Sequence, residues 1–66
     1  MNILLNGESH AIDDGATVLA LIEQLGLTGQ RLAVEVNGEI VPRGEHAAHL
    51  LHEGDRVEVV RAIGGG

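Results

Sequence analysis

The chain carries two Asn-Gly pairs, Asn6-Gly7 and Asn37-Gly38, and each stands between short runs rich in apolar residues. Asparagine and glycine both tolerate a positive φ, so this dipeptide favours the tight turn of a two-residue β-hairpin. The apolar residues before each pair alternate along the chain, which is typical of strands with one buried face. The strands of the two hairpins are expected over residues 1–6, 9–12, 32–36 and 39–41. Pro42 lacks a backbone N–H and is expected to end the last of them.

Between the two hairpins the apolar residues change to the period of a helix. Four of them recur at the i, i+3, i+4, i+7 spacing of one helical face. These residues are Val18, Leu21, Ile22 and Leu25. Thr17 is placed to cap the first turn through its hydroxyl, and Gly26 is placed to end the helix in a left-handed conformation. We therefore predict one amphipathic helix between Thr17 and Gly26.

The last third of the chain predicts a short turn followed by a strand. Residues 43–51 are weakly helical, and we expect a turn that buries Leu50 or Leu51. Residues 56–63 are rich in β-branched side chains and read as the final strand. Its core-facing residues are expected to be Val57 and Val59, and its outward-facing residues Val60 and Ala62.

The order of hairpin, helix, hairpin and strand predicts an α+β fold, with one helix packed on a small mixed sheet. The 66 residues suffice for a single domain, and we expect it over residues 1–63 with a flexible glycine tail at 64–66. A chain of this length buries a small core, which disfavours a deep enzyme pocket and favours a protein on which other proteins act.

Composition excludes several classes of function. Cysteine is absent, which rules out disulfides, thiol nucleophiles and cysteine-based metal sites. The net charge of -6 and the absence of aromatic residues argue against nucleic acid as a partner. No apolar run is long enough to span a membrane, and we expect a cytoplasmic protein. The acidic surface suits a basic protein partner, although it also serves solubility alone.

The segment that can take part in a reaction is the run of three glycines, Gly64-Gly65-Gly66, directly after the predicted final strand. Glycine has no side chain, so such a tail is thin, and three to four extended residues reach roughly 10–14 Å. It can carry the α-carboxylate of Gly66 into a narrow enzyme channel. ATP can activate this carboxylate as an acyl-adenylate, and a sulfur donor can displace AMP to leave a thiocarboxylate. The alternative is that the glycines are merely a frayed end.

The sequence resembles the ThiS family of sulfur carriers in thiamine biosynthesis, over its whole length. The segments that carry the resemblance are residues 36–43, Val-Asn-Gly-Glu-Ile-Val-Pro-Arg, residues 53–57, Glu-Gly-Asp-Arg-Val, and residues 62–66, Ala-Ile-Gly-Gly-Gly. The resemblance implies a ubiquitin-like β-grasp fold and a carrier that is not itself an enzyme. Gly65 and Gly66 are the residues that it implies to be functional, with Gly64 as part of the tail.

The same resemblance implies several partners. A ThiF-like enzyme would adenylate Gly66, a cysteine desulfurase or another donor would supply sulfur, and a ThiG-like thiazole synthase would accept it. ATP and magnesium would bind to the activating enzyme, and this chain would hold no cofactor.

Three other functions stay open from the residues. A carrier of the MoaD type would deliver sulfur to molybdopterin synthase by the same chemistry. A ubiquitin-like modifier would transfer its acyl group to protein lysines. A plain binding module would leave its glycine tail unused.

Two clusters of polar residues invite a different interpretation. His46, His49 and His52 are spaced by three, which suggests a metal site, but this spacing drifts around a helix and no further ligand completes the set. Solvated or packed histidines are the favoured interpretation, and we predict no metal. Asp13 and Asp14 precede a glycine and are interpreted as a solvated turn, in preference to a catalytic carboxylate pair.

A docking patch is also expected on the sheet face that the helix leaves uncovered. Its members would be Leu4, Ala33, Val60 and Ala62. Apolar residues on an uncovered face often mark an interface, and we assign this one to the activating enzyme.

Overall fold

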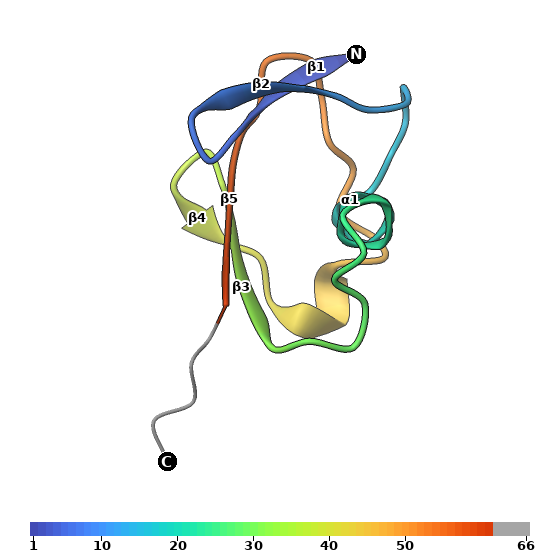
Figure 1. Cartoon of the computed structure of the whole chain (residues 1–66), viewed down its shortest axis with the longest axis vertical. Helices are drawn as coiled ribbons and strands as arrows, with labels where there is room; N and C mark the ends of the chain where they lie inside the picture. The colour runs from blue at the N-terminus through green and yellow to red at the C-terminus, as the bar shows by residue number, and fades with distance from the viewer. Residues whose placement is uncertain (62–66) are drawn as a thin grey trace.

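The computed structural model describes residues 1–61 and forms a five-stranded mixed sheet with one helix across one face (Figure 1). The elements are β1 (Asn2–Leu5), β2 (Glu8–Ala11), α1 (Val18–Gln24), β3 (Leu32–Val36), β4 (Glu39–Ile40), a 3₁₀ helix (Arg43–Glu45) and β5 (Arg56–Arg61). The strand order is β2-β1-β5-β3-β4, in which β1 and β5 are parallel and the other neighbours antiparallel. The α+β prediction is confirmed.

Both predicted hairpins form through their Asn-Gly pairs. Asn6 and Gly7 have φ of 50° and 84°, and Asn37 and Gly38 have φ of 53° and 86°. Two successive positive φ values define the type I′ turn, whose twist matches that of the flanking strands. The second hairpin is shorter than predicted because β4 ends at Ile40. The next residue, Val41, still donates its N–H to the carbonyl of Val34 at 2.8 Å.

The helix begins and ends where its capping residues predict. The hydroxyl of Thr17 accepts the N–H of Ala20 at 3.1 Å. At the other end Gly26 has a φ of 71°, and its N–H donates to the carbonyl of Glu23. The N–H of Leu27 donates to the carbonyl of Ile22 at 3.1 Å. This pair of bonds is a Schellman motif, which satisfies carbonyls that the helix end leaves free.

The segment after the 3₁₀ helix completes the cap at the start of α1. The N–H of Val18 donates to the carbonyl of His49, and the N–H of Leu19 donates to that of His46, both at 3.0 Å. The first N–H groups of a helix have no partner within it, so these carbonyls satisfy donors that burial would otherwise leave unpaired. The same segment buries Leu51 to 2% exposure and leaves Leu50 at 52%.

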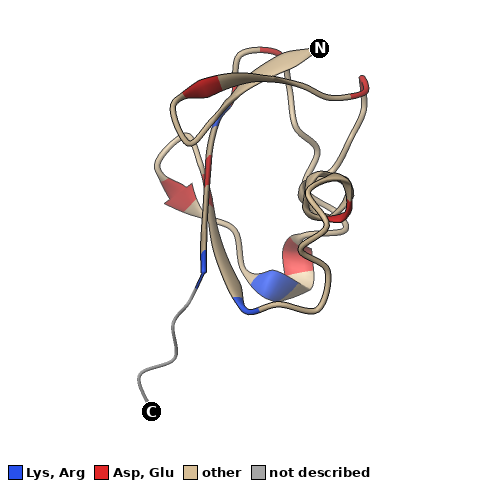
Figure 2. Cartoon of the chain, viewed as in Figure 1, with Lys and Arg blue, Asp and Glu red and all other residues tan. Residues whose placement is uncertain are grey.

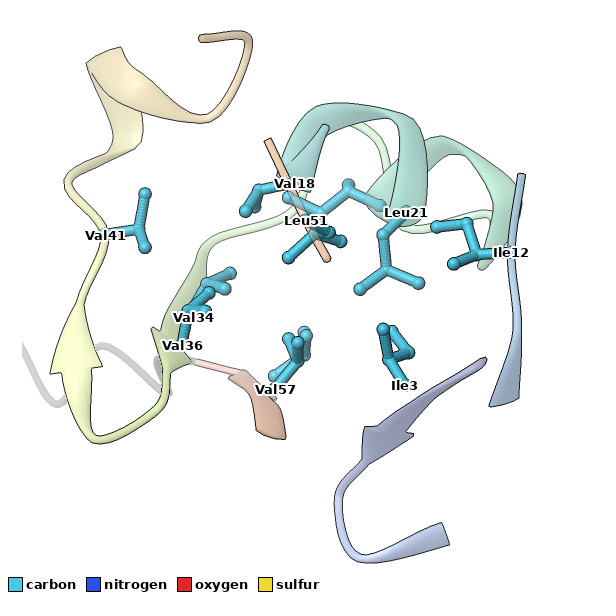
Figure 3. Close-up of a cluster of buried hydrophobic side chains, with 11 residues drawn as sticks. Ile3, Ile12, Val18, Leu21, Val34, Val36, Val41, Leu51 and Val57 are labelled. Atoms are coloured by element: carbon cyan, nitrogen blue, oxygen red, sulfur yellow. The ribbon is translucent and has the colours of Figure 1, made fainter. Parts of the chain in front are cut away.

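The core lies between α1 and the sheet, and Figure 3 shows side chains of the two layers pointing toward one another. Its buried members are Ile3, Ile12, Val18, Leu21, Ile22, Val34, Val36, Val41, Leu51, Val57 and Val59. The predicted helical stripe is confirmed, with Leu25 partly buried against this cluster. Full burial of such an aliphatic side chain stabilises the fold by about 1.5–3 kcal/mol. The described residues include no helix long and apolar enough to cross a membrane.

Candidate functional site

The strand that leads into the glycines is the middle strand of the sheet. β5 pairs with β3 over five residues, from Leu32 opposite Arg61 to Val36 opposite Val57, and with β1 on its other side. A strand with neighbours on both sides makes ladder hydrogen bonds along both edges. The predicted strand was residues 56–63, and β5 is described from Arg56 to Arg61. The predicted site residues Gly64, Gly65 and Gly66 lie outside the described residues.

A side chain from the first turn strengthens the hold on β5. The Oδ1 atom of Asn6 accepts the N–H of Val59 at 2.9 Å, and its Nδ2 atom donates to the carbonyl of Val59 at 3.2 Å. The backbone N–H of Asn6 donates to the carbonyl of Val57 at 2.9 Å. The side-chain amide thus replaces a peptide group and continues the parallel ladder beyond the end of β1. These three hydrogen bonds hold β5 at Val57 and at Val59, which is two residues before Arg61.

A second asparagine acts in the same way at the start of β5. The Oδ1 atom of Asn37 accepts the N–H of Arg56 at 2.9 Å, and its Nδ2 atom donates to the Asp55 carboxylate at 3.0 Å. Asp55 also accepts the N–H of His52 at 2.8 Å. The second hairpin turn is therefore tied to the turn that precedes β5.

The structure brings together only part of the predicted docking patch. Ala33 and Val60 face each other across β3 and β5, and Val60 is 55% exposed. Leu4, 41% exposed, lies opposite Arg56, four residues from Val60 along β5, which is about 13 Å in a strand. Ala62 lies outside the described residues.

Charged residues and one further apolar residue occupy the remainder of this face. Glu35 and Glu58 lie opposite each other between Leu4 and the Ala33–Val60 pair. Ile40 is paired with Glu35 and is 62% exposed, the largest exposure among the bulky apolar side chains of residues 1–61. Ile40 was not among the residues predicted for the docking patch. Neighbouring residues of a strand point to opposite faces, so a buried Val41 implies an outward Ile40.

The three spaced histidines do not converge. His46 is 7% exposed, and its Nε2 atom lies 3.1 Å from the carbonyl oxygen of Val41. The side chain of His52 is 77% exposed and lies 3.8 Å from Asp55. Within residues 1–61 no three His, Asp or Glu side chains gather as metal ligands.

The acidic pair before Gly15 has one structural contact that the sequence did not predict. The carboxylate of Asp14 lies 2.9 Å from the amine of Met1, which also donates to the carbonyl of Ile12 at 2.8 Å. The hydrogen bond to Asp14 is the main cause that raises the pKa of the Met1 amine. Asp14 therefore ties the start of β1 to the end of β2.

The arrangement of a single helix on a mixed sheet, with the first and last strands parallel at its centre, defines a protein of the β-grasp class. It superposes with a TM-score of 0.86 and 32% identity on the crystal structure of the thiamine biosynthesis protein ThiS of Geobacter metallireducens, with both chains covered completely. The model of the ThiS family matches residues 3–66. The chain belongs to the ThiS family.

Similar proteins include a separate sulfur carrier and two thiazole synthases. The sulfur carrier protein ThiS of Escherichia coli K12 is 36% identical over 66 residues, which cover both chains completely. Thiazole synthases of Magnetococcus marinus and Paramagnetospirillum magneticum are 46% and 41% identical over the same length. The chain spans 20% of the length of each of these two synthases.

Proposed function

We propose that this chain is a sulfur carrier of thiamine biosynthesis that bears its sulfur on the carboxylate of Gly66. The observation that carries the proposal is the run of three glycines that begins three residues after the last described residue of the central strand, Arg61, in a ThiS-family domain. The domain, residues 1–63, remains outside the partner enzymes, and residues 64–66 enter them. The chain has no cysteine, so its own side chains supply no sulfur nucleophile.

The proposed chemistry has two steps. The carboxylate of Gly66 attacks the α-phosphate of ATP, which forms an acyl-adenylate and releases pyrophosphate. Sulfide then attacks the acyl carbon, the bond to AMP breaks, and the terminal carboxylate becomes a thiocarboxylate. A ThiF-like enzyme binds the ATP and magnesium for these steps, and a cysteine desulfurase is the proposed source of the sulfur. The desulfurase supplies the sulfur as a persulfide, and a thiol reductant outside this chain must cleave its S–S bond to release the sulfide. These ATP-dependent steps fit a cytoplasmic protein.

The proposed acceptor is a thiazole synthase. Support comes from the two relatives named thiazole synthase, each of which includes a segment similar to this whole chain. A carrier segment and a synthase within one chain keep donor and acceptor at a high effective concentration. In this proposal the separate carrier reaches the same acceptor by diffusion.

The proposal is tested by intact-protein mass spectrometry after incubation with a ThiF-like enzyme, ATP and sulfide. We expect a mass gain equal to the replacement of one oxygen by sulfur, and no gain in a variant that lacks Gly66. A Gly66→Ala variant retains a terminal carboxylate and tests whether the tail must be thin. Absence of adenylate and of sulfur gain with an enzyme that is active on its own carrier would refute the proposal. The same measurement on protein purified from its cell shows whether the mature chain ends at Gly66.

We further propose that the apolar part of the open sheet face, Ala33 and Val60 with Leu4 and Ala62, docks the activating enzyme. Val60 is the most exposed described member, so a Val60→Asp variant is expected to fold normally and to be adenylated more slowly. Leu50→Asp is the matched control, because Leu50 is 52% exposed but lies outside the sheet. Equal adenylation rates of the Val60 variant and the parent would refute this assignment.

A further inference from the structure

The positive charges of this acidic chain gather at one end. Arg31, Arg43 and Arg61 are three of its four arginines. Arg61 lies opposite Leu32, which follows Arg31 in the chain, and Leu32 and Arg43 lie beside the same surface hollow. Figure 2 shows basic segments close together at the end of the molecule where β5 finishes. The chain has no lysine and carries a net charge of -6. All three side chains are exposed, and the ion pairs within residues 1–61 involve other groups. Arg61, the last described residue, therefore lies at an end of this acidic protein where three exposed arginines stand near one exposed acidic residue, Glu45 of the 3₁₀ helix.

A hollow of about 360 Å³ opens on the same end. It lies between α1, the loop at residues 28–30, the start of β3 and the 3₁₀ helix. Its lining includes the aliphatic side chains of Leu19, Ile22 and Leu32, with Arg43 beside them. Such a hollow fits an aliphatic side chain of a partner, with Arg43 available to an adjacent carboxylate.

The wall of the hollow is built from well-held backbone. His46 is buried in this wall, in contact with the carbonyl of Val41 at 3.1 Å, and its own carbonyl accepts the N–H of Leu19. These bonds fix the 3₁₀ helix against α1, so the hollow exists before a partner arrives. A preformed surface loses less conformational entropy on binding.

The open sheet face has the opposite electrostatic character. Glu35 and Glu58 lie directly opposite each other on β3 and β5, where like charges repel, and Arg56 lies two residues from Glu58 on the same face. The two carboxylates outnumber this cation, so the face suits a basic surface of a partner. An activating enzyme binds the triphosphate of ATP with cationic groups, which is consistent with its proposed place on this face. The basic end then remains for a second, acidic partner.

We infer that the basic end of the molecule, defined as Arg31, Arg43, Arg61 and the hollow, docks the sulfur acceptor. This inference rests on the proposed function, since it takes the acceptor to be a thiazole synthase. The synthase would present carboxylates around the entrance that receives the tail, and an aliphatic side chain that enters the hollow. Two surfaces of opposite charge let the carrier discriminate between the enzyme that loads it and the enzyme that unloads it.

The test uses the full-length chain and the purified thiazole synthase of the same organism. Arg43→Glu and Arg61→Glu reverse charges at the basic end, and Arg56→Glu is the matched control because Arg56 lies at the opposite end of β5. Binding to the synthase is measured by titration calorimetry at low and high salt. Thiocarboxylate formation by the activating enzyme is measured in parallel by intact mass.

A further pair of variants tests the hollow. Gly44 lines the hollow, and a Cβ atom there meets no atom within 4 Å, so Gly44→Phe adds a large side chain at the hollow without strain in the fold. Ala48→Phe is the control, because Ala48 is exposed and does not line the hollow. Circular dichroism confirms that each variant is folded.

We expect the Arg43, Arg61 and Gly44 variants to bind the synthase about tenfold more weakly or worse, with unchanged loading. The Arg56 and Ala48 variants should bind as the parent does, and the salt dependence of binding should decrease when Arg43 or Arg61 is reversed. Unchanged binding of the three test variants, or a loss confined to loading, would overturn the inference. Failure of the parent itself to gain sulfur would instead refute the proposed function.

Discussion

The side chain of Asn6 makes a testable contribution to the strand that leads into the tail. Its amide bonds to both the N–H and the carbonyl of Val59, at 2.9 and 3.2 Å. Replacement by glycine removes both bonds but keeps the turn, because glycine adopts the φ of 50° readily. Replacement by alanine removes both bonds and also places in the left-handed region a residue that tolerates it less well than asparagine does.

The expected magnitudes follow from these two differences. An intramolecular hydrogen bond contributes about 0.5–1.5 kcal/mol, so Asn6→Gly should lower the free energy of unfolding by about 1–3 kcal/mol. The left-handed conformation adds about 1 kcal/mol for alanine, so Asn6→Ala should lower it by about 2–4 kcal/mol. A domain of this size has a total stability of about 3–10 kcal/mol, so either change is a large fraction of the whole.

Urea denaturation gives the free energies, and hydrogen exchange reports on the site. We expect the amide of Val59 to lose protection in both variants, beyond the change that global stability accounts for. Asn37→Gly is the control, because Asn37 occupies the same turn position with a φ of 53° but bonds to exposed partners near Arg56. An Asn6→Gly protein within about 0.5 kcal/mol of the parent, with Val59 still protected, would refute the reasoning.

Three further predictions concern the core, the helix cap and the amino terminus. Leu51→Ala should destabilise the fold by about 2–5 kcal/mol in urea denaturation, whereas Leu50→Ala should change it by less than about 0.5 kcal/mol, because only Leu51 is buried. Thr17→Ala should lower the thermal midpoint through the loss of about 1 kcal/mol of capping, and an unchanged midpoint would contradict that role. In a protein that begins with a free Met1 amine, the raised pKa of this amine stabilises the fold below about pH 8, and the contribution should disappear as pH rises through the folded pKa. Asp14→Asn should reduce this alkaline loss of stability, since Asp14 is the main cause of the raised pKa, and an identical pH profile for the variant would refute the pairing.

The elements of the fold that are determined by residues close together in the chain were predictable from the sequence. The Asn6-Gly7 and Asn37-Gly38 turns, the cap at Thr17 and the left-handed Gly26 each rest on a local preference, and the structure confirms all four. The choice between Leu50 and Leu51 was left open, because adjacent residues in an irregular segment carry no period. Packing of that segment against α1 decides it.

Contacts between distant segments were not predictable in this way. The bond from Asn6 to Val59 joins residues 53 apart in the chain, and nothing in the local sequence distinguishes it from an ordinary turn asparagine. The same holds for Met1 with Asp14 and for the burial of His46. The docking patch was predicted from side-chain alternation alone, which gives the face but not the distance between Leu4 and Val60.

The central place of β5 makes closure of the sheet depend on the strand that is synthesised last among the described elements. Without β5 the rest of the sheet consists of two hairpins, β1–β2 and β3–β4, which do not pair with each other. The sheet therefore cannot close before β5 has been made. A nascent or prematurely ended chain without this strand stays open to proteolysis, and a partner that recognises the closed sheet selects chains that include β5.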